Sequence, residues 1–262
     1  MRGERDPMEN NLLYGRHAVE EALKAERTFE KIFLLQTAHP SEILQRIRRM
    51  AESNSIPVLF APREKLDRLA HNQDHQGVVG VLSSFDYASL EEILERTKTR
   101  KLIVVLDHLE DPQNVGSLLR TCDAVSVAGV IIPKRRAAGL GAGTAKASAG
   151  ALQHVPVARV GNLHQTLLQF RKLGFTLVGA DQSGEKNYHE FDYPEPLVLV
   201  LGNEHQGLSL LLKNTCDSLV KIPMQGHLDS LNVSVAGALL LYQVYLHQKK
   251  TGKENESATR TV

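Results

Sequence analysis

The stretch LIVVLDHLEDPQNVGSLLR (102–120) joins a strand-like apolar run to a helical pattern through a polar loop. Similar apolar runs recur after it, separated by helical patterns: GVIIP (129–133), VPVARV (155–160), FTLVGAD (175–181), LVLVLG (197–202) and SLVKIP (218–223). This alternation of strands and helices is typical of a mostly parallel sheet that is covered by helices on both faces. The second half of the chain is therefore predicted to be an α/β domain.

The first half reads as a smaller α/β domain, which we place at residues 11–84. Its predicted strands are KIFLLQ (31–36), PVLFA (57–61) and GVVGVLSS (77–84). Ser41 is expected to cap a helix between the first two of them. The charged segment 85–100 is predicted to be a helical linker, and the large domain then covers 101–249. The polar segment 250–262 is expected to be a disordered tail.

Composition restricts the possible function classes. The 262 residues include 31 Lys and Arg against 30 Asp and Glu, so no strong overall field attracts nucleic acid, and RNA binding would need local patches. The two cysteines cannot form a disulfide framework or a four-cysteine zinc site, and HNQDH (71–75) lacks the glutamate of a metalloprotease pair. No metal is therefore expected. Since neither a signal peptide nor an apolar run of about 20 residues is present, we expect a cytoplasmic protein without a membrane span.

Candidate site residues follow the strands, because parallel α/β sheets bind ligands at the carboxyl ends of their strands. In the first such loop, Asp107 ends the strand, Pro112 stiffens the loop, and Asn114 is expected to cap the next helix. Arg120 lies further along that helix. Taken alone, a helix cap and a solvated arginine explain this segment equally well.

Two later loops carry a comparable pattern. In LGNEHQGLS (201–209), Gly202 permits a close backbone approach to a ligand, and Glu204 lies in a turn that Gly207 closes. In KIPMQGHLDSLNVSVAGALL (221–240), Ser230 or Asn232 is expected to open the last helix. That helix is apolar on more than one face, so it must be buried, and a subunit interface is one way to bury it.

In this order and spacing, the three loops resemble the three signature motifs of the SpoU (TrmH) family of RNA 2′-O-methyltransferases. The resemblance covers residues 100–247. YGRHAVEEAL (14–23) and DHQGVVGVL (74–82) further resemble the substrate-binding domain of the rRNA-directed members, which is similar to ribosomal protein L30e. The resemblance implies a SPOUT-type fold, in which a parallel sheet contains a deep trefoil knot, a rare exception to the rule that chains do not thread loops.

The resemblance also implies a cofactor and site residues. S-adenosyl-L-methionine would be the methyl donor, bound beside a homodimer interface. Gly202, Ile222 and Leu231 would line its pocket, with Met224 nearby. The residues expected around the reacting ribose are Asn114, Arg120, Glu204, Ser230 and Asn232.

Methyl transfer to a ribose hydroxyl requires alignment and removal of a proton. A guanidinium has a pKa above about 12 and is a poor base, so we assign Arg120 to stabilising the developing alkoxide. The proton would leave through Glu204 or water. Asn114 and Asn232 would position the substrate.

RNA contacts are expected from local cations, which are Lys134, Arg135, Arg136 and Arg16. Aromatic residues are only 5% of the chain, which favours recognition of phosphate and shape over base stacking. The N-terminal segments favour rRNA, and the resemblance implies a guanosine of large-subunit (23S) rRNA as the target. The alternatives are a tRNA ribose, an rRNA adenosine, or a non-catalytic RNA-binding or ribosome-assembly protein with the same fold.

Overall fold

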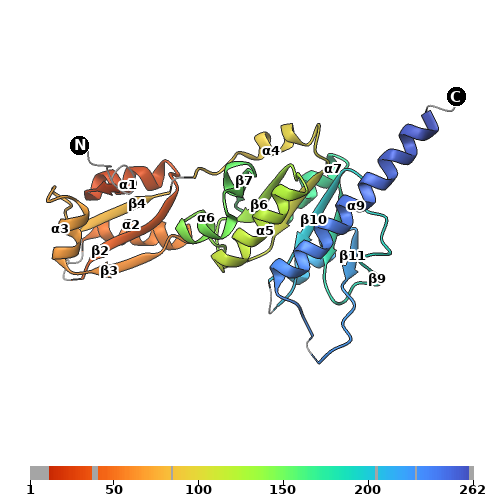
Figure 1. Cartoon of the computed structure of the whole chain (residues 1–262). Coiled ribbons are helices and arrows are strands. Elements are labelled where there is room, and N and C mark those ends of the chain that lie inside the picture. The colour runs from red at the N-terminus through yellow and green to blue at the C-terminus, as the bar shows by residue number, and fades with distance from the viewer. Residues whose placement is uncertain (1–11, 37–40, 84, 204–205, 228, 260–262) are drawn as a thin grey trace, which may run out of the picture. The chain divides into compact units, whose positions relative to one another are not determined.

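The computed structural model describes residues 12–36, 41–83, 85–203, 206–227 and 229–259, without the side chains of residues 142 and 252–259 (Figure 1). The chain forms two compact units. The first contains residues 1–86 and 138–145, and the second contains residues 87–137 and 146–262. The boundary near residue 86 is close to the predicted end of the N-terminal domain, but the grouping of residues 138–145 with the first unit was not predicted.

The first unit contains a four-stranded mixed sheet. Its strands, in spatial order, are β1 (Leu12–Tyr14), β4 (Val78–Leu82), β2 (Phe29–Leu35) and β3 (Val58–Ala61). The helices are α1 (Arg16–Lys24), α2 (Glu42–Ser53) and α3 (Arg63–Leu69). Val19 and Ile47 bring α1 and α2 into one apolar cluster, whereas Leu66 of α3 packs in a second. Ser41 caps α2 as predicted, because its hydroxyl accepts a hydrogen bond from the Leu44 amide.

The second unit is built on a seven-stranded sheet in which every pair of neighbours is parallel, which confirms the predicted fold class. In spatial order its strands are β7 (Val157–Val160), β6 (Gly129–Pro133), β5 (Leu102–Leu106), β10 (Leu197–Leu201), β8 (Thr176–Ala180), β11 (Ser218–Lys221) and β9 (Lys186–Asn187). The continuous apolar runs of β5 and β10 are buried on both faces, as the parallel arrangement requires. The two-residue strand β9 was not predicted.

Helices cover both faces of this sheet. One apolar cluster combines Val198 and Val200 of β10 with residues of α4 (Leu90–Arg96), α7 (Leu163–Lys172) and α8 (Leu210–Thr215). The alternate residue Leu201 points to the other face, where its side chain lies close to Gly237 of α9 (Val233–Thr259). There α9 packs beside α5 (Pro112–Ala124), so closely that a Cβ on Gly237 would lie 2.3 Å from Leu118 (Figure 1). Two short helices, α6 (Ala142–Ser148) and η2 (Ala151–Gln153), complete the chain.

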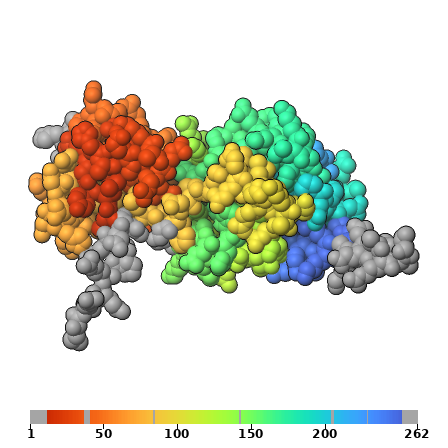
Figure 2. Space-filling model, turned by 90° about the horizontal axis from the view of Figure 1, so that it is seen from above, coloured from red at the N-terminus to blue at the C-terminus, as the bar shows by residue number. Residues whose placement is uncertain are grey.

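The segment expected to be a linker, 85–100, is largely part of the second unit. Ile93 of α4 is fully buried in the apolar cluster of that unit, and Ala88 forms a parallel bridge with Ala158. Figure 2 shows this yellow segment lying against the green and lime surface of the second unit. The charged residues of the segment concealed the few apolar residues that pack into this cluster, which are Ala88, Leu90, Ile93 and Leu94. Only two residues of the segment, Phe85 and Asp86, fall outside the second unit.

The last helix, α9, differs from its prediction at its end. It runs to Thr259, so the structure places a helix over most of the segment expected to be a disordered tail. Lys and Glu in that segment are good helix formers, and they extend the helix beyond its apolar part. Among the described residues, none of the helices has the length and apolar character needed to cross a membrane.

The strand order brings two of the predicted loops together. β10 lies between β5 and β8, although β6, β7 and β8 all precede it in the sequence. Leu201 pairs with Leu106, so Gly202 and Asp107 leave neighbouring strands at the same edge of the sheet. The sheet order reverses at this point, which is where ligands bind in open α/β sheets. The trefoil knot itself stays a prediction.

Candidate functional site

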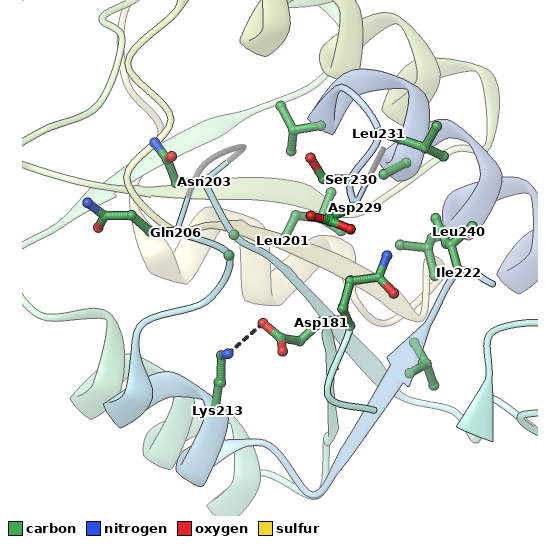
Figure 3. Close-up of a pocket in the computed structure, with 17 residues that line it drawn as sticks. Asp181, Leu201, Asn203, Gln206, Lys213, Ile222, Asp229, Ser230, Leu231 and Leu240 are labelled. Carbon is green, nitrogen blue, oxygen red and sulfur yellow. Dashed lines mark ion pairs between the residues drawn. The ribbon is translucent and has the colours of Figure 1, made fainter. Parts of the chain in front are cut away.

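A cavity of about 400 Å³, here called the first cavity, opens at the carboxyl ends of β8, β10 and β11 (Figure 3). Its apolar wall includes Leu201, Ile222, Leu231 and Leu240. Polar side chains line the rest of it, among them Asp181, Lys213, Asp229 and Ser230. Gly202, Ile222 and Leu231, the three residues predicted to line the pocket of the methyl donor, all line this cavity.

Gly202 is fixed by the folding of the loop that follows it. A Cβ at Gly202 would lie 2.2 Å from the carbonyl carbon of Gly207 and 2.4 Å from the amide nitrogen of Leu208. Asn203 and Gly207 close this turn with two backbone hydrogen bonds of 3.0 and 2.8 Å, and Gly207 has a φ of 64°. Gly202 was predicted to let the backbone approach a ligand closely. The structure shows that a glycine is required here because the backbone of residues 207 and 208 packs against it.

Asp181 and Lys213 form an ion pair in the first cavity. The Lys213 Nζ lies 2.8 Å from Asp181 Oδ2, and the Asp181 side chain is only 6% exposed. Burial by itself would raise the pKa of this carboxyl. Hydrogen bonds from Lys213 and Ser183 outweigh burial and hold the pKa below its usual value. The cavity therefore contains a carboxylate at neutral pH.

A second cavity of about 590 Å³ lies beside the first at the end of β5. Asn203, Gln206 and Gly207 line both cavities, as does Val233. The polar residues specific to the second cavity are Asp107, His108, Glu110, Asp111, Asn114, Arg136 and Ser209. Two adjoining cavities that share one turn can hold two reacting molecules next to each other.

Asn114 and Asn232 connect the first and the third predicted motif. The Asn232 Nδ2 donates a 3.0 Å hydrogen bond to Asn114 Oδ1, and Asn232 Oδ1 accepts from the amide and the hydroxyl of Ser234. The backbone N–H of Ser234 can only donate, so the Asn232 oxygen must face Ser234. The Asn232 amide nitrogen is thereby directed toward Asn114. The sequence offered Ser230 or Asn232 as the residue that opens the last helix, and the structure shows that Asn232 opens α9.

The expectation that Asn114 caps α5 is wrong. The cap is Asp111, whose carboxylate accepts a 2.9 Å hydrogen bond from the Gln113 amide. Pro112 takes the first helical position, where its missing N–H costs nothing, so the helix begins before Asn114. Asn114 lies in the first turn, 8% exposed, and its side chain is free from capping to reach Asn232.

His108 is not among the residues predicted from the sequence. Its Nδ1 is hydrogen-bonded to Oδ1 of the buried Asp107, and its own ring is 42% exposed at the second cavity. Asp107 Oδ2 accepts a 3.0 Å hydrogen bond from the Ser209 amide, which fixes the carboxylate. A histidine directly after the aspartate that ends a central strand is the signal that would have indicated it.

Other predicted residues lie apart from this pair of cavities. Arg120 is exposed on α5 and is not among the described residues that line either cavity. Met224 is half-buried and also outside the described lining. Glu204 lies outside the described residues. Lys134, Arg135 and Arg136 are consecutive cations and are here called the KRR cluster. Of these, Arg136 lines the second cavity, whereas Arg135 is exposed and Lys134 is half-buried.

In the first unit, Arg16 lines a separate cavity of about 580 Å³. Its Nε donates a 2.8 Å hydrogen bond to the carbonyl of Gln76. His75, from the pair of histidines in HNQDH, is buried there between Asp67 and the amide of Gly77. Within the described part of the chain, no group of three or more His, Cys, Asp or Glu could hold a metal ion.

Family models match both halves of the chain. Residues 101–242 match the SpoU rRNA Methylase family. Residues 12–88 match the family described as RNA 2′-O ribose methyltransferase substrate binding. A Bacillus subtilis protein assigned to the TrmH family of tRNA/rRNA methyltransferases is 40% identical over 248 residues, covering 94% of this chain and 99% of the relative.

Solved structures agree with these matches. The SpoU methyltransferase AviRb from Streptomyces viridochromogenes, in complex with AdoMet, superposes with a TM-score of 0.57 at 25% identity, over 91% of this chain and 90% of AviRb. The TrmH/SpoU tRNA modifying enzyme of A. aeolicus superposes with a TM-score of 0.54 at 33% identity, over 62% of this chain and 84% of the enzyme.

Proposed function

The chain belongs to the SpoU rRNA Methylase family, and from this premise we propose that it methylates a ribose 2′-hydroxyl of large-subunit rRNA in the cytoplasm. It is an RNA methyltransferase of the TrmH/SpoU family that uses S-adenosyl-L-methionine. The observation that carries the finer proposal is the pair of adjoining cavities at the ends of β5 and β10. One cavity would hold the methyl donor and the other the acceptor nucleotide.

The residues of the first cavity fit the methyl donor. Its volume of about 400 Å³ falls within the usual range for small-molecule sites, about 300–1,000 Å³. The apolar wall of Leu201, Ile222 and Leu231 suits an adenine ring, and the carboxylate of Asp181 suits polar groups of the donor. The donor supplies an electrophilic methyl group on a positively charged sulfur. Gly202 and Ser230 line the same cavity, and Met224 stays assigned to the donor site from the sequence motif alone.

The second cavity would receive the ribose. Asn114 and Asn232 are fixed by each other and by Ser234, so they can orient the nucleotide without first being ordered themselves. Arg136 in the wall would contact a phosphate. Glu204 stays assigned to this region from the sequence motif alone.

We further propose that the active form is a homodimer. Four apolar residues of α9 are exposed at a spacing of four, three and four residues, which places them on one side of the helix: Val235, Leu239, Tyr242 and Leu246, of which Leu246 is 59% exposed. α9 packs beside α5, which carries Arg120 outside both cavities of its own chain. A second copy on this face would cover the apolar residues and bring Arg120 to the partner's site, where its fixed charge would stabilise the developing alkoxide.

The RNA target is proposed from the N-terminal unit. Its match to a substrate-binding family, with Arg16 at a cavity and the KRR cluster of the other unit, favours a large structured RNA. Within such RNA we propose a guanosine of 23S rRNA. A tRNA substrate is the second candidate, because the A. aeolicus structure of similar fold is a tRNA modifying enzyme.

The test uses purified protein with methyl-labelled S-adenosylmethionine and unmodified large-subunit rRNA, small-subunit rRNA or bulk tRNA. Nuclease digestion and chromatography then separate 2′-O-methylated nucleosides from base-methylated ones. Arg120→Ala and Lys98→Met are run in parallel, the latter as a matched loss of an exposed cation whose ion pair is at the surface.

Label in 2′-O-methylguanosine of large-subunit rRNA, lost in Arg120→Ala and retained in Lys98→Met, is the expected result. Label only in tRNA would overturn the rRNA assignment and retain the ribose chemistry. Label in a base would overturn the 2′-hydroxyl assignment. Bound donor with no methylated RNA of any class, including precursor ribosomal particles, would favour a non-catalytic RNA-binding protein.

A further inference from the structure

We propose that His108 is a catalytic residue whose Nε2 accepts the proton of the ribose 2′-hydroxyl, with Asp107 as its positioning residue. This inference rests on the proposed function. It replaces the expectation that the proton leaves through Glu204 or water.

The first observation is the pairing of the two side chains. Asp107 directly follows β5 and is 1% exposed, and its Oδ1 is hydrogen-bonded to His108 Nδ1. The amide of Ser209 holds the other carboxylate oxygen at 3.0 Å. Carboxylate oxygens accept hydrogen bonds, so we assign the hydrogen of this pair to Nδ1, which leaves Nε2 with a basic lone pair.

The second observation is the position of the ring. His108 has a φ of 57°, an unusual backbone angle for a residue with a side chain, and its carbonyl accepts a 3.0 Å hydrogen bond from Asn203 Nδ2. The ring lines the second cavity together with Asn114. Since Nδ1 faces the buried carboxylate, Nε2 points away from it, and no described residue hydrogen-bonds Nε2. The backbone is thus held in an uncommon conformation that places a base in the acceptor cavity.

Elementary chemistry favours this residue over the arginine of the motif. A guanidinium is protonated throughout the physiological range, whereas an imidazole exchanges its proton between about pH 5 and 8. A histidine oriented by a buried carboxylate is a recurrent general base. Arg120 can then remain a fixed charge.

The step balances without any further reactant. The 2′-oxygen forms a bond to the methyl carbon while the carbon–sulfur bond breaks, and the bonding electron pair stays on sulfur, which becomes neutral. The hydroxyl proton moves to Nε2 of His108, which becomes the imidazolium. One positive charge is present before the step and one after it, and the product is a 2′-O-methyl ribose. Asp107 stabilises the imidazolium by its proximity.

The pH dependence follows from the groups around the ring. The titratable and charged side chains that face the second cavity, among the described residues, are Asp107, Glu110, Asp111 and Arg136. Single-turnover rates should rise with pH across the range in which imidazoles lose their proton, and then level off.

The decisive variant is His108→Gly, because glycine adopts a φ of 57° without strain and leaves room for a free imidazole. His189→Gly is the control: His189 is also an exposed histidine 3.7 Å from a carboxylate, and it is outside the described lining of both cavities. Donor affinity is measured by calorimetry, and single-turnover ribose methylation is measured from pH 5 to 9 with and without added imidazole.

We expect His108→Gly to bind S-adenosylmethionine within twofold of wild type and to methylate about a hundredfold or more slowly. The pH-dependent rise should be lost, and added imidazole should increase the rate of the variant at least tenfold. His189→Gly should behave as wild type. Independently of activity, nitrogen NMR should show His108 with hydrogen on Nδ1 and not on Nε2 at pH 8, and Asp107→Asn should reverse this preference.

Normal turnover in His108→Gly, a loss that imidazole does not reverse, or hydrogen on Nε2 in the wild type would each overturn the role of His108. In those cases wild-type ribose methylation would still support the proposed function. If the wild type labels a base or no RNA, the proposed function fails, and the inference fails with it.

Discussion

Asn232 donates a 3.0 Å hydrogen bond to Asn114, which lies 118 residues earlier in the chain. This bond joins the helix cap of α9 to the first turn of α5. Asn114 lines the second cavity, and Val233, which follows Asn232, lines both cavities. The polar groups predicted from two separate motifs are therefore parts of one hydrogen-bonded unit.

The Asn114–Asn232 pair can be measured by a double-mutant cycle. Asn232→Ala removes a helix cap, which costs about 1 kcal/mol, and either substitution breaks the bond between the asparagines. The double variant should therefore lose less than the sum of the single variants, by about 0.5–1.5 kcal/mol, in urea unfolding. Ser117→Ala, an exposed position on α5, provides the control. Strict additivity would show that the two side chains are not coupled.

Gly202→Ala should weaken binding of the methyl donor. Its Cβ would overlap backbone atoms of residues 207 and 208 at 2.2–2.4 Å, and backbone cannot move aside as a flexible side chain can. We expect at least a tenfold loss of affinity for S-adenosylmethionine by calorimetry, together with a lower melting temperature. The matched variant Gly161→Ala meets no atom within 4 Å and should retain both properties. Wild-type affinity in Gly202→Ala would show that the turn can open without affecting the cavity.

Lys213 should govern the acid stability of the second unit through Asp181. A carboxyl whose folded pKa is depressed stabilises the fold above the unfolded value of about 3.9, and this contribution is lost as the pH falls through the folded pKa. Lys213→Met removes the main lowering cause and leaves burial, which raises the pKa. Acid unfolding, followed by circular dichroism, should therefore begin at a higher pH. Lys98→Met, which breaks an exposed pair, should leave the midpoint in place.

The dimer and the position of Arg120 can be tested together. Leu239→Glu introduces a charge into the exposed apolar side of α9 and should yield monomers in sedimentation velocity, whereas Gln243→Glu, outside the four-residue stripe, should not. Arg120→Ala and Gly202→Ala subunits are mixed at a donor concentration at which neither variant is active alone. The mixture should recover about a quarter of wild-type turnover, since half of the dimers are then heterodimers and each of these has one working site. Recovery is expected because one site then has both an intact donor cavity and a partner's arginine. No recovery would place Arg120 in the site of its own chain.

Much of the fold was predictable from periodicity. The apolar runs of the second unit became parallel strands because they are buried on both faces, and Ser41 capped α2 because a serine before an amphipathic run supplies the missing acceptor. Helix starts were harder. Pro112 moved the start of α5 ahead of Asn114, and this changed the role of Asn114 from a cap to a hydrogen-bond partner.

The site was predictable in its location and less so in its members. Gly202, Ile222 and Leu231 were indicated by their motifs and do line one cavity. The pairs Asp181–Lys213 and Asp107–His108 depend on which strands are neighbours in the sheet, and on a histidine backbone in the left-handed region. Strand neighbours cannot be read from this sequence, because β10 is made after both β5 and β8 and yet lies between them in the sheet.

The position of β10 between β5 and β8 also determines the order in which parts of the chain can fold during synthesis. Until residues 197–201 have been synthesised, β5 and β8 each have one unpaired edge. Asn203 follows these residues, so its hydrogen bond to the carbonyl of His108, 95 residues earlier, also forms late. Contacts between such distant segments form slowly. A nascent chain on the ribosome can therefore complete the strands of its first unit long before it can bind a methyl donor, because the first cavity needs residues as far along the chain as Leu240.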